Sequence, residues 1–115
     1  DYGAYNHELR HALAARICLL NNDQITADHY SFNAGTYRAL IDPGNTGHDF
    51  DLGHVLNFID KVATRPRDVT EKDIKTLQKA GVKDPDIVRL AELNSFMAYQ
   101  IRLIAGLRLF KGFES

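Results

Sequence analysis

The stretch Asp84 to Phe110, DPDIVRLAELNSFMAYQIRLIAGLRLF, is the longest uninterrupted helical pattern in this chain of 115 residues. Asp84 can cap a helix and Pro85 is tolerated at its first position, while Lys111-Gly112 predicts its end. Roughly 26 residues at 1.5 Å each make a rod of about 39 Å. That length exceeds the diameter of about 28 Å expected for a compact chain of this size. We therefore expect the fold to be organised around this helix.

The apolar residues of the long helix cover more of its circumference than one packed face needs. One stripe consists of Leu90, Leu93, Met97, Ile101, Ile104 and Leu107, and the residues that widen it are Ile87, Phe96, Leu103 and Phe110. Such a helix is either the centre of a bundle or shared with another subunit. Because only 115 residues are available to wrap it, we expect both: a core helix whose far side is a subunit interface.

Composition and charge indicate one domain, residues 1–115, and exclude several kinds of partner. The chain is 44% hydrophobic and 25% charged with a net charge of −1, so it offers no basic surface for nucleic acid or anionic lipid. A single cysteine, Cys18, excludes an internal disulfide framework. Polar residues such as Asn94 interrupt the long helix at every turn, which argues against a membrane span. We expect a cytoplasmic domain without a signal peptide, and its abrupt start at Asp1 suggests a piece of a longer chain.

Hydrophobic spacing predicts four further helices before the long one. They cover residues 7–22, 26–40, 50–63 and 70–80. Gly35 weakens the second of these and predicts a close backbone approach, and Gly81 ends the fourth. No window alternates apolar and polar residues in the way of a strand. The predicted fold class is therefore all-α, a helical bundle of about five helices.

Helix starts are predicted from capping residues. Asn6, Thr26 and Asp49 can each cap the helix that follows, and Thr70 with Asp73 resembles a capping box. The loop between the second and third helices, residues 42–49, is rich in turn-forming residues and separates the first helix pair from the remainder.

The segment His7-Glu8-Leu9-Arg10-His11 matches H-E-x-x-H, the pattern that places two imidazoles around zinc with a glutamate as general base. No predicted sheet precedes it and no supporting ligand follows at the usual distance. We therefore interpret it as a solvated helix face and predict no metal and no cofactor.

Two other groups of residues could carry chemistry. Cys18 has no adjacent His or Lys at i−4 to lower its pKa, so a small buried hydrophobe is favoured over a reactive thiolate. A second group, His48, Asp49, Asp51 and His54, could form a metal site, but helix capping with exposed histidines is the preferred interpretation. His29 follows Asp28 on the second helix; taken alone, such a histidine is more often an interior side chain than a catalyst.

Three segments carry a resemblance to a known family. They are AGVKDPDIVRLAELNSFMAYQIRLIAGL from Ala80, DVTEKDIKTLQKAG from Asp68, and ALAARICLLNN from Ala12. The chain resembles, over about nine-tenths of its length, the carboxymuconolactone decarboxylase and alkyl-hydroperoxidase-D-like (CMD) superfamily. The resemblance implies an all-helical subunit that assembles into trimers or hexamers through its long helices, with a companion CMD domain as a further expected partner.

The redox members of this superfamily carry Cys-x-x-Cys-x-x-x-His at the start of the second helix, with a glutamate upstream. That chemistry needs a low-pKa thiolate and a second thiol to close the disulfide. If His29 matches the family histidine, Asn22 and Ile25 replace the cysteines. If Leu20-Asn21 matches the family's Leu-Asn, the replacements are Asp23 and Thr26, with Tyr30 for the histidine. Neither register contains sulfur.

Three functions remain open at this point. The preferred one is an oligomerising, peroxidase-silent member of the superfamily. The second is an acid-base enzyme of the decarboxylase type acting on a small acidic substrate, with His29 as the catalyst, Glu8 or His11 tuning it, and Arg16 or Arg102 holding a carboxylate. The third is antioxidant thiol peroxidase chemistry through Cys18 between subunits. An alkyl-hydroperoxidase-like label is expected at the level of the family.

Overall fold

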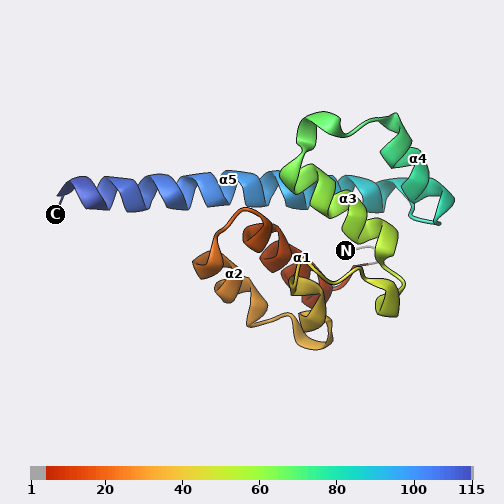
Figure 1. Ribbon diagram of the computed structural model, residues 1–115, viewed down its shortest axis with the longest axis horizontal. Helices are drawn as coiled ribbons and strands as arrows, with labels where there is room; N and C mark the ends of the chain where they lie inside the picture. The colour runs from red at the N-terminus through yellow and green to blue at the C-terminus, as the bar shows by residue number, and fades with distance from the viewer. Residues whose placement is uncertain (1–4, 115) are drawn as a thin grey trace.

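The computed structural model describes residues 5–114, with side chains described up to Leu109. Residues Asp1–Ala4 and the side chain of Phe110 therefore lie outside the described part of the chain. The elements are α1 (His7–Leu20), α2 (Gln24–Ser31), η1 (Gly35–Ile41), η2 (His48–Phe50), α3 (Gly53–Thr64), η3 (Pro66–Asp68), α4 (Glu71–Lys79) and α5 (Asp84–Glu114), where η denotes a 3₁₀ helix (Figure 1). No strand occurs within residues 5–114, so the all-α prediction is confirmed.

The centre of the bundle is α1. Every residue from Ala12 to Cys18 is buried, so this helix is enclosed on all sides rather than along one stripe. It contacts α2, η1, α3 and α5. Small side chains at Ala12, Ala14 and Ala15 let the neighbouring elements come close.

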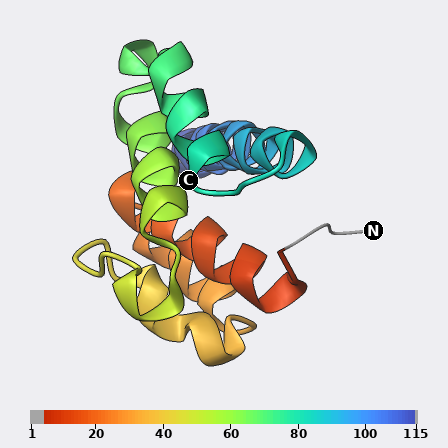
Figure 2. The same ribbon diagram turned by 90° about the vertical axis from the view of Figure 1, so that its right-hand side faces the viewer.

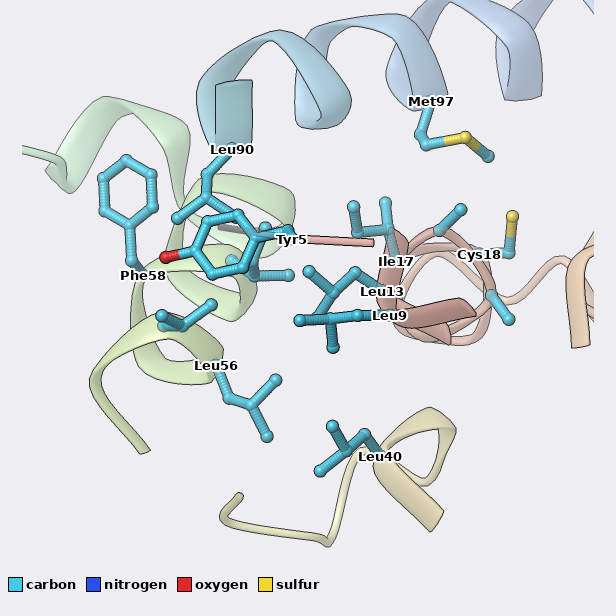
Figure 3. Close-up of a cluster of buried hydrophobic side chains, with 14 of the residues drawn as sticks. Tyr5, Leu9, Leu13, Ile17, Cys18, Leu40, Leu56, Phe58, Leu90 and Met97 are labelled. Carbon is cyan, nitrogen blue, oxygen red and sulfur yellow. The ribbon is translucent and has the colours of Figure 1, made fainter. Parts of the chain in front are cut away.

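The core is formed where α1 meets the N-terminal half of α5. In Figure 3 Leu13 and Ile17 of α1 lie in the middle of the cluster, with Leu56 below them and Leu90 and Met97 of α5 above. Burial of such side chains stabilises the fold by about 1.5–3 kcal/mol each. The apolar stripe predicted for the long helix is therefore part of the core, but only over its first half.

The long helix is expected to be a core helix whose far side is left for a subunit interface, and the described chain encloses only its N-terminal half. Figure 2 looks along α5 and shows α1, α3 and α4 gathered around its N-terminal half. The C-terminal half stands clear of the other helices in Figure 1, and the molecule is 53 Å long but only 31 by 29 Å across. Leu103 and Leu107 are 47% and 57% exposed. The chain has too few residues to enclose both α1 and the whole of α5.

Local capping explains several helix boundaries. Asn6 caps α1 by accepting a hydrogen bond from Leu9 N at 2.9 Å, and Thr70 forms a capping box with Asp73 at the start of α4. Both caps were predicted from the sequence and are confirmed. Gly81, at φ +93°, follows α4 as expected.

Other boundaries differ from the predictions. The helix predicted over 26–40 is split, because α2 ends at Ser31 and the chain turns through Gly35 at φ +57° into η1. A Cβ at Gly35 would lie 2.0 Å from Oε2 of Glu8, so the predicted close approach is confirmed. The long helix also continues past Gly112 to Glu114, since a single glycine costs a helix only about 1 kcal/mol.

The third helix begins later than predicted. Asp49 does not cap it; Asp49 lies in η2, and α3 starts at Gly53 without a side-chain cap. The loop instead closes on itself, with Leu52 N donating to the carbonyl of Gly47 at 2.9 Å. Asp51 adopts φ +57° to allow this closure.

Arg16 is the one large charged side chain in the centre of the described core, only 1% exposed. Its Nε and Nη2 each donate to a different carboxylate oxygen of Asp60 at 2.7 Å. The remaining guanidinium protons go to the carbonyls of Leu40, Asp42 and Pro43 at 2.9–3.2 Å. All five donors are used, so Arg16 ties α1 to α3 and η1 and is not free to hold a substrate carboxylate.

Candidate functional site at the junction of α1, α2 and α5

The start of α2 is the position where redox members of the resembled superfamily carry their cysteines. Asp23 caps this helix: its Oδ1 accepts from Thr26 N at 3.0 Å and its Oδ2 accepts from Thr26 Oγ1 at 2.6 Å. Both side chains are buried. Asn22 lies outside the helix at φ +60°, and Ile25 is 67% exposed. Of the two registers left open by the sequence, the one through Asp23 and Thr26 has both positions buried and hydrogen-bonded to each other, whereas Asn22 and Ile25 are exposed.

The carboxylate of Asp23 is held in its charged form. Burial by itself would raise the pKa of Asp23, but the two hydrogen bonds from Thr26 and the nearby Arg108 outweigh it, so the pKa lies below its usual range. Arg108 Nη1 lies 3.8 Å from Asp23 Oδ1. This contact links the C-terminal half of α5 to the start of α2.

Cys18 lies beside this cap, at the end of α1. Its side chain is completely buried, as expected from the sequence, and its carbonyl accepts from Asp23 N at 2.9 Å. Burial, and to a lesser extent the charge of Asp23, raises the pKa of the Cys18 thiol to about 12. At neutral pH the thiolate that peroxide chemistry needs is therefore nearly absent.

Tyr30 connects α2 to both neighbouring helices. Its hydroxyl donates a hydrogen bond to Oε1 of Gln100 on α5. Its ring lies 6.0 Å from the ring of His11 on α1 and 5.1 Å from the ring of His29, measured between centroids. Burial raises the pKa of Tyr30, and Cys18 adds to the shift, while the bond to Gln100 opposes it. The phenol stays protonated in the physiological range.

The three residues proposed from the sequence as acid-base catalysts are only partly brought together. His11 and His29 both contact the ring of Tyr30. The carboxylate of Glu8 instead lies against Gly35, in the turn after α2. His29 is exposed rather than interior, because the buried face of the short α2 is occupied by Thr26 and Ala27.

The H-E-x-x-H segment forms the first turns of α1. His11 Nδ1 donates to the carbonyl of His7 at 2.7 Å, one turn earlier on α1. The two rings lie 6.3 Å apart, and together with Tyr30 and Met97 they line a groove of about 150 Å³. Within the described residues no three His, Cys, Asp or Glu side chains are grouped so as to hold a metal ion.

The second candidate metal group lies around η2 and the start of α3. His48 and His54 are exposed, as the preferred interpretation expected, and with Asp51 they line an open cleft of about 370 Å³. Asp49 is exposed and is not part of this lining. Among the described side chains, no three of these His and Asp residues are grouped so as to hold a metal ion.

Sequence reasoning missed one polar residue in the core. Asn94 was counted among the polar residues that interrupt the long helix, yet it is only 3% exposed. Its spacing gives the signal: it lies four residues after Leu90 and three before Met97, on the buried stripe of α5. Asn94 lines a cleft of about 400 Å³ that also contains Arg102.

Comparisons with known proteins add nothing to this geometry. None of the described helices combines the length and the hydropathy of a transmembrane span. No protein-family model, no curated protein and no solved structure matches the chain.

Proposed function

We propose that this chain is a self-associating, peroxidase-silent helical domain of the CMD-like kind, in which the outer face of α5 is the subunit interface. The observation that carries the proposal is a row of exposed apolar side chains along that face. The outer face is defined by Val88, Phe96, Tyr99, Leu103 and Leu107, which are 47–64% exposed. Monomeric proteins rarely leave so continuous an apolar surface in water.

The spacing of the outer face suits a helical partner. From Phe96 onward the residues follow each other at three- and four-residue intervals, which is the pattern of a helix-to-helix seam. The C-terminal half of α5 projects from the body, so a partner helix can approach it without meeting other elements (Figure 1).

Charge along α5 favours a second copy of the same chain as the partner. Asp84 and Glu92 lie toward its N-terminus and Arg102 lies toward its C-terminus, whereas Arg108 faces Asp23 of the same chain. Two copies that pair antiparallel place acidic segments beside basic ones and set their helix dipoles antiparallel, which is the favourable side-by-side arrangement. The resemblance to the CMD superfamily implies that the subunits assemble into trimers or hexamers through their long helices.

Peroxidase silence rests on the absence of a usable thiolate. The two positions that should hold cysteines carry Asp23 and Thr26, which satisfy each other as a helix cap. Cys18 is buried and its pKa is raised to about 12. In this proposal the domain serves to oligomerise, and a companion CMD domain carries the catalytic residues. A cytoplasmic location also belongs to it, supported by the single reduced cysteine.

Sedimentation equilibrium tests the association. We expect the wild-type chain to sediment as an oligomer at tens of micromolar, and Leu103→Glu/Leu107→Glu to sediment as a monomer, because burying two carboxylates in the interface is unfavourable. Phe32→Glu is the matched control: Phe32 is 82% exposed but lies outside α5, so its variant should keep the wild-type mass. A monomeric wild-type chain at high concentration would overturn the proposal.

A peroxide-consumption assay tests the claim that the domain has no peroxidase activity. With a dithiol reductant present, we expect wild type and Cys18→Ser to consume hydrogen peroxide at the same rate as buffer. Thiol labelling of native protein should be slow and should become fast on addition of urea. Peroxide consumption that disappears in Cys18→Ser would contradict peroxidase silence while leaving the association result intact.

A further inference from the structure

The starting observation is a buried amide with no partner. Asn94 is 3% exposed, and neither its Nδ2 nor its Oδ1 makes a hydrogen bond within the described residues. A buried side-chain amide normally has its donors and acceptor satisfied, because losing water without a replacement is unfavourable. An unsatisfied amide in an otherwise well-packed helix therefore points to a group that completes it.

The space for such a group is present. Asn94 lies in the wall of the cleft of about 400 Å³ between the ends of α1 and α3 and the middle of α5. That volume falls within the range of about 300–1,000 Å³ that is usual for small-molecule sites. The apolar part of the wall consists of Ile17, Val62, Ala63, Pro66, Ala98 and Ile101.

The positive charge in the lining of the cleft favours an anionic ligand. Arg102 is the one charged residue in its described lining, and no Asp or Glu lines it. Arg102 makes no ion pair with any side chain up to Leu109, in contrast to Arg16 on α1, which is fully paired. An unpaired guanidinium at an apolar cleft favours a carboxylate, which it can bind through two hydrogen bonds.

The polar groups also call for a hydrogen-bond donor on the ligand. Asn21 uses its amide nitrogen to bond the carbonyl of Ile17 at 3.0 Å, so its oxygen is left as an acceptor in the cleft wall. Asn94 offers a second free acceptor together with two donors. A hydroxyl group next to a carboxylate matches this set, whereas a simple fatty acid satisfies only the donors.

We propose that this cleft, lined by Asn21, Asn94 and Arg102, binds a small hydroxycarboxylate that carries an apolar tail. The carboxylate accepts from Arg102 and from the Asn94 amide, the hydroxyl donates to a free side-chain oxygen, and the tail lies on the apolar wall. The lining of the cleft does not include Asp23 or Thr26, and of the residues invoked for self-association it shares only Arg102.

Nuclear magnetic resonance titration of the full chain tests the proposal, with mandelate as the probe. We expect saturable shifts of the Asn94 side-chain amide resonances. Two control compounds should bind with an affinity lower by about tenfold or more. Phenylacetate lacks the hydroxyl and 1-phenyl-1,2-ethanediol lacks the carboxylate, so each loses a hydrogen bond to a buried or charged group. Arg102→Gln should lose the preference for mandelate over the diol. Equal affinity for mandelate and the diol would overturn the assignment, as would the absence of any saturable shift.

Asn94→Leu separates binding from folding. It keeps the size of the side chain and removes the unsatisfied amide, so we expect mandelate binding to be lost while the thermal midpoint is unchanged or raised. A large drop in the midpoint would show that Asn94 has partners in the folded protein and would overturn the site. The interface variant Leu107→Glu should bind mandelate like the wild type. Asn94 resonances that move on dilution without any probe would show that a second copy fills the cleft, which would also overturn the proposal.

Discussion

Two helical segments of this protein have the same kind of sequence and opposite surroundings. Both α1 and the C-terminal half of α5 carry apolar residues around their circumference. The chain encloses α1 completely, with α2, η1, α3 and α5 packed on it. It leaves the end of α5 bare, with Leu107 57% and Leu109 67% exposed. An all-round apolar helix is stable in water only when something covers it, and this difference is the basis of the proposed self-association.

Removing the buried ion pair between Arg16 and Asp60 should weaken the packing around α1. We expect this change to have the largest effect on the free energy of unfolding. In Asp60→Ala the guanidinium of Arg16 keeps its three carbonyl acceptors but loses its counter-charge. We expect a loss of about 3 kcal/mol in the free energy of unfolding, measured by urea denaturation. The double variant Arg16→Met/Asp60→Leu should recover most of that loss. A loss below about 1 kcal/mol for Asp60→Ala would mean that α1 is not held by this pair.

A matched pair of leucines on α5 compares its two halves directly. Leu90 is 2% exposed and Leu107 is 57% exposed. At low protein concentration, Leu90→Ala should cost about 2–5 kcal/mol of unfolding free energy, because it opens a cavity in the core. Leu107→Ala should change it by no more than about 0.5 kcal/mol. Equal losses in urea denaturation of the dilute protein would show that the chain itself covers both halves.

The contact between Arg108 and Asp23 is an ion pair that joins the C-terminal half of α5 to the rest of the chain, and its effect on stability should be small. Arg108 is 46% exposed and 3.8 Å from the carboxylate, so Arg108→Gln should cost no more than about 0.2–1 kcal/mol at neutral pH. The folded-state pKa of Asp23 is lowered. The ionised Asp23 carboxylate therefore contributes to the free energy of unfolding above its unfolded-state pKa of about 3.9. That contribution is lost as pH falls through the lower folded-state pKa. The difference between wild type and Arg108→Gln should fade across that acidic window. A difference that persists in acid would place the role of Arg108 elsewhere.

Local signals in the sequence were the most informative part of the prediction. The caps at Asn6 and Thr70 and the close approach at Gly35 depend on residues a few positions apart, and all were found as expected. Errors occurred where two local signals competed. Asp23 caps α2 three residues ahead of Thr26, and Gly35 ends a helical pattern that runs on to Leu40.

Long-range features could not be read from spacing. The spacing of apolar residues identifies helices with large apolar surfaces, but it does not indicate which of them the chain buries in its core. The sequence therefore placed the long helix at the centre, where the structure has α1. In the same way, the position of Asn94 on an apolar stripe is visible in the sequence, whereas its missing partners and the cleft beside it appear only once α1, α3 and α5 are assembled. The family resemblance stays a prediction.

Amide hydrogen exchange of residues 102–109 tests the central claim most directly. An uncovered helix end of this length is marginal in water, so its amides should exchange rapidly unless another chain packs on it. We predict slow exchange at several hundred micromolar, loss of that protection on dilution, and rapid exchange at all concentrations in Leu103→Glu/Leu107→Glu. Rapid, concentration-independent exchange in the wild-type chain would contradict the claim that a second copy covers the end of α5.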